Sequence, residues 1–175
     1  LNLSISSNPS RINPILASDS ASSEISQWIF NGLFKYDKDG NIVNDLASSY
    51  KFINDTTLEI TIKKNIKWHD GIELTSKDII YTYNQIISPK IFTSLKSSFD
   101  YVKSVKKINR YKIEVKYKKP YFKALNIWMT GILPSHILKD EKDLMKSTFN
   151  KNPIGTGSYK LKSLKNSSDI VLEAN

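Results

Sequence analysis

The chain has 175 residues, of which 39% are hydrophobic and 25% are charged, as is usual for a globular protein. Its 26 Lys and Arg residues exceed its 17 Asp and Glu residues, which leaves a formal net charge of +9, and it contains no cysteine. The lack of cysteine excludes disulfides, thiolate metal sites and a cysteine nucleophile. No apolar run approaches the roughly 20 residues that a membrane-spanning helix needs.

The positive charge comes almost entirely from lysine, because Arg11 and Arg110 are the only arginines. Proteins that read nucleic acids favour arginine for bidentate contacts with guanine and phosphate, whereas lysines on alternate strand positions are typical of a solvated face. We therefore expect no nucleic-acid partner. A basic module that binds nucleic acid or an anionic surface stays as the alternative of another class.

The chain has only two histidines, His69 and His136, and their spacing matches none of the short metal-binding motifs. Asp70 follows His69 and serines are frequent, but no GxSxG motif presents an exposed serine nucleophile. We therefore expect no metal site, no cofactor, no catalytic residue and no enzymatic activity. A hydrolase that uses His69 is kept as a third hypothesis.

The first fifty residues consist of short apolar segments separated by turns. Alternating apolar and polar residues predict a half-buried strand over residues 1–6. After a Pro-containing loop, apolar residues at helical spacing predict a helix over residues 21–34. Residues 36–41 predict a tight turn around a glycine, and residues 46–47 a short helical turn.

Two pairs of strands show the period of two that marks one buried and one exposed face of a sheet. The first pair, over residues 50–52 and 58–62, meets at a turn over residues 54–56. The second pair covers residues 101–108 and 111–117, with lysines on the outward positions. We expect an antiparallel meander with one wet face.

The stretch IKWHDGIELTSKD, residues 66–78, combines the end of a strand, a turn and the start of a helix. Asp70 and Gly71 supply the turn. Thr75 and Asp78 have the spacing of a capping box, which also puts a negative charge at the positive end of the helix dipole. The helix ends before Ser88-Pro89. Its apolar stripe, which excludes Thr82, consists of Ile79, Ile80, Tyr83, Ile86 and Ile87.

The segments that follow the second strand pair differ in polarity. Residues 121–129 are rich in aromatic side chains, which we interpret as core because aromatics at this spacing pack against sheets more often than they form a ligand box. Residues 133–136 begin a short helix, with proline tolerated in its first turn. Residues 140–150 are polar, and we expect them to be mobile.

Gly155 and Gly157 occur in a segment that only superficially resembles a phosphate loop, because the GxxxxGK[ST] spacing and its lysine are missing. We expect the two glycines to let the backbone pass closely between two packed units. Two further strands, over residues 159–164 and 170–172, complete the chain.

Several short motifs occur in a fixed order along almost the whole chain. They are INP at 12–14, FNGLFKY at 30–36, DLASSY at 45–50, IKKNIKWHDG at 62–71, LTSKDI at 74–79, KPY at 119–121 and NPIGTGSY at 152–159. In this order they resemble the family 5 extracytoplasmic solute-binding proteins, the oligopeptide, dipeptide and nickel receptors of ABC importers. Ser158, where that family usually has proline, and the segment before Asn65, where an arginine is common, depart from the pattern.

The resemblance implies an α/β fold of the periplasmic-binding-protein-like class II, in which two lobes close on a ligand. Members of the family are several hundred residues long, so we expect this chain to be a fragment. Residues 1–31 and 155–175 would be pieces of the first lobe and residues 32–154 an inserted β-rich subdomain, with the second lobe absent. In such a subdomain the His69-Asp70 pair is structural and holds a strand to a helix.

The resemblance also implies a function and a location. The protein would capture di- or oligopeptides and deliver them to an ABC permease in the membrane, with a nickel or nickel-chelate receptor of the same family as the alternative. The location would be periplasmic or extracytoplasmic, with a removed N-terminal signal as a route to membrane anchoring. Because one face of a cleft cannot enclose a ligand, the remainder of its own chain is a further expected partner.

In the resembling receptors, the extended segment after the Asn-Pro motif lies along the cleft and pairs its main chain with a bound peptide. That segment is 17–20 here, and Ser18, Asp19 and Ser20 are therefore the expected ligand-binding residues. Their short polar side chains leave the backbone accessible, as in strand addition. The structural alternative is a helix cap, because the segment also precedes the first helix.

Overall fold

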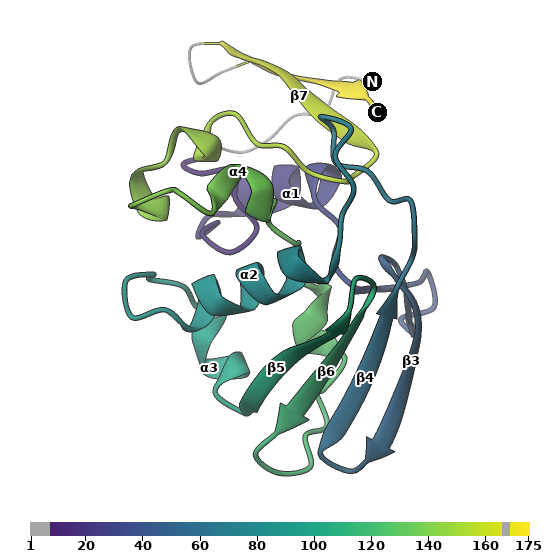
Figure 1. Cartoon of the computed structure of the whole chain (residues 1–175). Coiled ribbons are helices and arrows are strands. Elements are labelled where there is room, and N and C mark those ends of the chain that lie inside the picture. The colour runs from purple at the N-terminus through teal and green to yellow at the C-terminus, as the bar shows by residue number, and fades with distance from the viewer. Residues whose placement is uncertain (1–7, 166–168) are drawn as a thin grey trace.

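The computed structural model describes residues 8–165 and 169–175, and Figure 1 shows how their elements are arranged. The strand expected over residues 1–6 lies outside the described residues. In chain order, the helices and strands are α1 Ser20–Ile29, β1 Phe34–Tyr36, β2 Ile42–Asn44, β3 Ala47–Asn54, β4 Thr57–Ile62, α2 Ser76–Ile87, α3 Lys96–Phe99, β5 Val102–Asn109, β6 Lys112–Tyr117, the 3₁₀ helix η1 Asn126–Met129, α4 Ser135–Leu138, the 3₁₀ helices η2 Leu144–Lys146 and η3 Thr148–Asn150, β7 Tyr159–Lys165 and β8 Asp169–Ala174.

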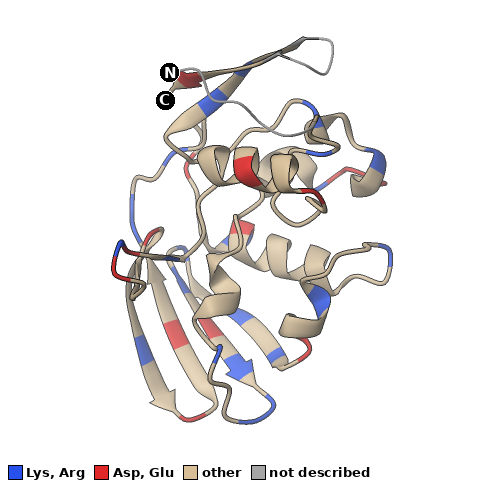
Figure 2. Ribbon diagram, turned by 180° about the vertical axis from the view of Figure 1, so that it is seen from behind, with Lys and Arg blue, Asp and Glu red and all other residues tan. Residues whose placement is uncertain are grey.

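A four-stranded antiparallel sheet with the strand order β3-β4-β6-β5 forms one end of the molecule (Figure 1). Every second side chain of β4 and β6 lies on the covered face, where Ile60 opposes Ile113 and α2 lies across them (Figure 1). The other face is wet, and Lys112 and Glu59 form an ion pair there at 3.1 Å. Figure 2 shows residues of both charges along these strands. Both predicted strand pairs are therefore confirmed.

The capping box at the start of α2 is confirmed. The backbone N–H of Thr75 donates to Asp78 Oδ2 at 2.8 Å. The side chain of Thr75 accepts a hydrogen bond from a backbone N–H in the first turn of α2. The apolar stripe differs from the prediction at two positions. Ile87 is exposed, whereas Thr82 is buried and its hydroxyl accepts a hydrogen bond from the backbone N–H of Leu133 at 2.9 Å. Thr82 is tolerated inside because it satisfies a buried backbone donor.

Helix α1 is shorter than the predicted 21–34, because it ends at Ile29 and Phe34 already belongs to β1. The segment between them leaves the helix to pair with the chain around η1. The backbone N–H of Leu33 donates to the Trp128 carbonyl at 2.8 Å, and a Cβ on Gly32 would overlap the backbone of Met129. This distant pairing, rather than local preference, ends the helix.

The helical turn predicted at residues 46–47 is wrong, because Ala47 is the first residue of β3. The backbone N–H of Ala47 donates to the Leu33 carbonyl at 3.0 Å, and that of Asp45 donates to the same carbonyl at 2.9 Å. The segment is thus held by Leu33, which is adjacent in space but distant in sequence.

The prediction that residues 140–150 form a polar segment is also wrong, whereas their mobility stays a prediction. Leu144 and Phe149 are buried, and two short 3₁₀ helices replace the expected irregular segment. Asn150 is the anchor: its Nδ2 donates to the Leu144 carbonyl at 2.8 Å, and its Oδ1 accepts from Asn13 Nδ2 at 2.9 Å. Because Asn13 lies 137 residues away in sequence, the local composition could not reveal this contact.

The two strands predicted at the end of the chain are confirmed as β7 and β8, which pair as a hairpin at the end of the molecule opposite the four-stranded sheet (Figure 1). The hairpin packs on α1, where the rings of Trp28 and Tyr159 meet edge to face with their centroids 5.3 Å apart. The molecule therefore has α1 and the hairpin at one end and the sheet with α2 at the other, and residues 155–158 lead into β7.

Candidate functional site

Hydrogen bonds to the side chain and backbone of Asn13 hold the loop before α1 in place. The side chain of Asn13 is buried, its Oδ1 accepts from the backbone N–H of Ile15 at 3.1 Å, and its backbone carbonyl accepts from Leu16 and Ala17. This asparagine turn sets the direction in which the chain runs from Pro14 towards α1.

Asp19 lies at the end of this loop and caps α1. Its Oδ1 accepts from the backbone N–H of Ser22 at 2.7 Å, and its Oδ2 accepts from the hydroxyls of Ser10 and Ser22 at 2.6 and 2.7 Å. Although partial burial opposes the change, hydrogen bonds from Ser10 and Ser22 lower the pKa of Asp19 to about 2. The Asp19 carboxylate is therefore ionised at neutral pH and engaged within its own chain.

Ser18 and Ser20 are exposed on either side of Asp19. The backbone at Asp19 is extended, with φ −116° and ψ 159°, and Ser20 is the first residue of α1. The first backbone N–H groups of a helix have no hydrogen-bond partner within the helix. The backbone N–H group of Ser20 therefore makes no intrahelical hydrogen bond. The three predicted residues thus lie together, with two of them presenting backbone groups at the surface and the third acting as the cap.

A groove with a volume of about 320 Å³ lies beside α1, and we call it the α1 groove. Ala17 reaches it, whereas Ser18, Asp19 and Ser20 lie outside its lining. Its walls come from four segments that are distant in sequence: Pro14, Ile15 and Ala17; Ser23, Ser26, Gln27 and Phe30; Thr93, Ser94 and Leu95; and Met129, Thr130 and Gly131.

The lining of the α1 groove contains no ionisable side chain. It offers apolar surface together with hydroxyl, amide and backbone groups, which is the mixture that holds small molecules and peptide backbones by contact and hydrogen bonds. Gly131 allows the walls to meet, because a Cβ there would lie 2.7 Å from both Phe30 Cβ and Pro14 Cβ. Sequence reasoning missed the walls at 93–95 and 129–131, since no local signal connects them with α1.

The close passage predicted at Gly155 and Gly157 is confirmed, because a Cβ on Gly155 would overlap the backbone carbonyl of Ile29 and a Cβ on Gly157 would overlap those of Trp28 and Ile29. His69 holds this passage. Its backbone N–H donates to the Gly155 carbonyl at 2.9 Å, and its Nδ1 accepts from the Gly155 N–H at 3.2 Å. Since Nδ1 accepts, the proton is on Nε2, which donates to the Gly157 carbonyl at 3.0 Å. We call this arrangement the His69 joint.

The hydrogen bonds of the His69 joint give the histidine a structural role, so its presence does not require a catalytic one. His69 and Asp70 face different partners, because Asp70 Oδ2 lies 2.8 Å from Nε2 of His136. The motif therefore does more than connect a strand to a helix, since His69 ties it to the chain that leads into β7. Within residues 8–165 and 169–175, no three His, Cys, Asp or Glu side chains gather in a way that could hold a metal ion.

Comparison with known proteins identifies the family. The model of the bacterial extracellular solute-binding proteins, family 5 Middle, matches residues 41–175. The oligopeptide-binding protein AppA of Bacillus subtilis is 36% identical over 173 residues, which cover 95% of this chain and 32% of that protein. The chain thus spans about a third of the length of the curated relatives it matches.

Solved structures show the same fold. AppA of Bacillus subtilis in complex with a nonapeptide superposes with a TM-score of 0.89 and 35% identity, over 97% of this chain and 35% of that one. NikZ of Campylobacter jejuni in complex with Ni(L-His) superposes with a TM-score of 0.88 and 30% identity, over 100% of this chain and 34% of that one. These matches confirm the predicted α/β fold of the periplasmic-binding-protein-like class.

Two further expectations concern activity and the membrane. The relatives are solute-binding proteins and not enzymes, which agrees with the prediction that this chain is not an enzyme. In the described part of the chain, no helix is both long enough and apolar enough to cross a bilayer. The chain belongs to the bacterial extracellular solute-binding proteins of family 5.

Proposed function

We propose that the protein is the extracytoplasmic substrate-binding component of an ABC importer, which captures di- or oligopeptides and delivers them to a membrane permease. The α1 groove carries this proposal, because a neutral lining rich in hydroxyl and backbone groups suits the repeating amide groups of a peptide. The 36% identity to an oligopeptide-binding protein supports the same ligand class.

We further propose that residues 1–31 and 155–175 belong to one lobe and residues 32–154 to a subdomain inserted into it. The His69 joint supports this division, because it connects a turn of the inserted part with Gly155 and Gly157, where the chain returns to α1. The remainder of the full-length protein would supply the opposite lobe and enclose the ligand.

The exposed backbone around Ser18 and Ser20 is our proposed contact with the peptide main chain. Its support is geometric: the chain is extended at Asp19, and the N–H of Ser20 has no partner within α1. The Asp19 side chain would act indirectly, because its hydrogen bonds to Ser10 and Ser22 hold this backbone in place.

A nickel or nickel-chelate ligand is the second candidate, favoured by the 30% identity to NikZ in complex with Ni(L-His). The α1 groove offers no carboxylate, imidazole or thiolate to such an ion. A nickel ion would therefore have to bring its own chelating molecule or find its ligands elsewhere in the full-length protein.

The family is extracellular, and we propose a periplasmic or extracytoplasmic location for this protein, with anchoring to the membrane through a removed N-terminal signal. The permease in that membrane would be its partner in transport.

Calorimetry on the full-length protein can test the peptide contact with a Ser20→Pro variant. Proline is tolerated at the first position of a helix and after an extended residue such as Asp19, so the fold is preserved while one backbone donor is lost. We expect peptide affinity to fall about tenfold, the effect of one hydrogen bond at the upper end of the usual range.

The matched control is Ser20→Ala, which changes the side chain but keeps the N–H, and it should bind as the unmodified protein does. Peptide affinity that is unchanged in Ser20→Pro would rule out this contact. Tight binding of Ni(L-His) without any binding of peptides would replace the first candidate ligand by the second.

A further inference from the structure

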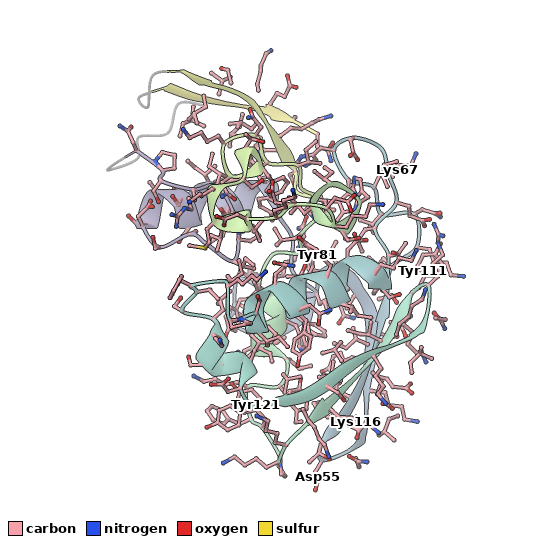
Figure 3. All side chains as sticks on the ribbon, turned by 60° about the vertical axis from the view of Figure 1, so that its left-hand side comes forward. Asp55, Lys67, Tyr81, Tyr111, Lys116 and Tyr121 are labelled. Carbon is pink, nitrogen blue, oxygen red and sulfur yellow. The ribbon has the colours of Figure 1, made fainter. Side chains whose placement is uncertain are left out.

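An exposed aromatic and basic surface lies at the end of the molecule farthest from the β7–β8 hairpin, where Figure 3 shows Tyr121 and Lys116. It is separate from both the α1 groove and the His69 joint. We call it the aromatic–lysine surface, and it consists of Tyr101, Tyr121, Phe122, Lys118, Lys119 and Lys123.

The aromatic rings of this surface form a connected group. The rings of Tyr101 and Tyr121 are stacked, with their centroids 4.5 Å apart and their planes 6° from parallel. The ring of Phe122 lies 6.0 Å from that of Tyr121. Tyr101 is 38% exposed and Phe122 is 88% exposed, so Phe122 projects almost completely into solvent. Single exposed apolar residues are common, but a cluster of rings that includes an exposed phenylalanine indicates an interaction surface.

Hydrogen bonds hold the turn that carries Phe122 in place. Tyr117 is buried, and its hydroxyl donates to the carbonyl of Ala124 at 2.6 Å. The N–H of Ala124 donates to the Tyr121 carbonyl at 3.0 Å, and the N–H of Lys118 donates to the Tyr101 carbonyl at 2.9 Å. The exposure of Phe122 is therefore a built feature of the fold, since both ends of its turn are fixed.

The segment that carries Tyr121 and Phe122 has charges of one sign. The sequence KYKKPYFK at residues 116–123 contains four lysines and no carboxylate. The Nζ of Lys119 lies 5.3 Å from the ring centroid of Tyr101, and the Nζ of Lys123 lies 5.5 Å from that of Phe122. Of the described residues, none forms an ion pair with Lys118, Lys119 or Lys123.

The four-stranded sheet provides a partial contrast, because two of its lysines have acidic partners. Lys112 pairs with Glu59 at 3.1 Å, and Lys116 pairs with Glu114 at 3.6 Å. Figure 2 shows both colours on those strands. The aromatic–lysine surface thus combines exposed rings with three lysines that have no ion pair among the described residues, and Lys119 and Lys123 lie over those rings.

We propose that the aromatic–lysine surface docks the protein onto a lipid bilayer with anionic headgroups. Tyrosine and phenylalanine rings are suited to the boundary between headgroups and acyl chains, and lysines gain from the negative potential of anionic lipid. The ammonium groups of Lys119 and Lys123 lie over the rings and form no ion pair among the described residues, so they are available to lipid phosphate. A nucleic acid would fit less well, because the surface has no arginine for bidentate phosphate contacts. This inference does not depend on the proposed function.

Binding of the full-length protein to vesicles can test the proposal. Sedimentation with phosphatidylcholine vesicles is compared with and without phosphatidylglycerol, at low and at high salt. We expect binding only with phosphatidylglycerol and a loss of binding at high salt. Replacing Lys118, Lys119 and Lys123 together by glutamine should weaken partitioning on the order of a hundredfold, since each lysine near an anionic surface contributes about a factor of five.

The matched control replaces Lys38, Lys90 and Lys142 by glutamine, which makes the same change in net charge at exposed sites outside the surface. It should alter partitioning by about twofold or less, because screening limits the reach of distant charges. An equal loss in the control would overturn the proposal and leave only a general effect of net charge.

Two variants of Phe122 test insertion of the ring. Phe122→Ser should weaken partitioning about tenfold with an unchanged unfolding midpoint, because the ring is exposed in the folded protein. In Phe122→Trp, brominated lipids should quench the added fluorescence. Absence of that quenching, or equally tight binding of duplex DNA that Phe122→Ser leaves unchanged, would overturn a lipid surface in favour of a general polyanion.

Discussion

The His69 joint and the α1 groove both contact α1, but they are formed by different kinds of contacts. At the joint, His69, Gly155 and Gly157 are joined by three hydrogen bonds, and the glycines touch the helix backbone. In the groove, neutral side chains from four distant segments surround open space. The joint contains the most distinctive motif of the sequence, and its hydrogen bonds are made within the chain, whereas the groove is formed by residues that carry no distinctive signal.

The difference shows why a dense motif need not mark a binding site. A joint needs particular residues, because close backbone approach tolerates only glycine and a two-sided hydrogen bond needs a neutral imidazole. A groove that binds through backbone and hydroxyl groups needs shape, which many residues can supply. Substitutions at the joint should therefore change stability, and substitutions in the groove should change ligand affinity.

The largest expected effect is that of Gly155→Ala. Its Cβ would overlap the carbonyl group of Ile29, and that backbone cannot move without displacing the end of α1. We expect the free energy of unfolding to fall by about 3 kcal/mol, the upper end of the range for overpacking. Denaturant unfolding measures it. Gly40→Ala is the control: Gly40 has φ +81° but nothing within 4 Å of its Cβ, so only about 1 kcal/mol of backbone strain is expected. Similar losses in the two variants would contradict the steric role of Gly155.

Ser94→Trp tests the α1 groove, where we expect a change in ligand affinity with little change in stability. Ser94 is exposed and lines the groove, so a tryptophan there should occupy the space available to a ligand. We expect ligand affinity of the full-length protein to fall at least about tenfold, while the free energy of unfolding changes by about 0.5 kcal/mol or less, as for other surface positions. Calorimetry and a denaturant melt give the two numbers. Unchanged affinity would show that the ligand lies elsewhere.

Sequence patterns predicted those elements whose causes are local. The alternation in β4 and β6 reflects one covered face, and the capping box of Thr75 and Asp78 needs only residues three apart. The close passage at Gly155 and Gly157 was also predicted, because two glycines around one small residue allow a close backbone approach.

The errors at α1 and at residues 140–150 arise from contacts between distant residues. Helix α1 ends early because Leu33 pairs with Trp128, and residues 140–150 are held because Asn150 reaches Asn13. The groove was missed for the same reason, since its walls meet only in the folded chain. Ser18, Asp19 and Ser20 came from the family resemblance, and the structure adds that Asp19 is the cap of α1. Their contact with a ligand stays a prediction.

The smallest expected effect is a pH dependence at the His69 joint. Burial lowers the pKa of His69 below its usual 6.5, and the nearby charge of Lys160 acts in the same direction, against the Gly157 carbonyl and Asp70. Protonation of Nδ1 would also remove the hydrogen bond that this atom accepts from the Gly155 N–H. In the unfolded chain His69 titrates near 6.5.

Between that value and the lower pKa of the folded protein, the unfolded chain binds more protons, so stability falls as the pH falls through this interval. Above it, His69 contributes no pH dependence. His69→Gln cannot be protonated and should lose this slope, which unfolding midpoints between about pH 7 and about pH 5 would reveal. The lowered pKa values of Asp19 and Asp70 act only in more acidic solution, where protonation of these carboxyls removes their stabilising hydrogen bonds. An identical slope in the variant would show that protonated His69 fits the joint as well as neutral His69, and the hydrogen bond from Gly155 would then be dispensable.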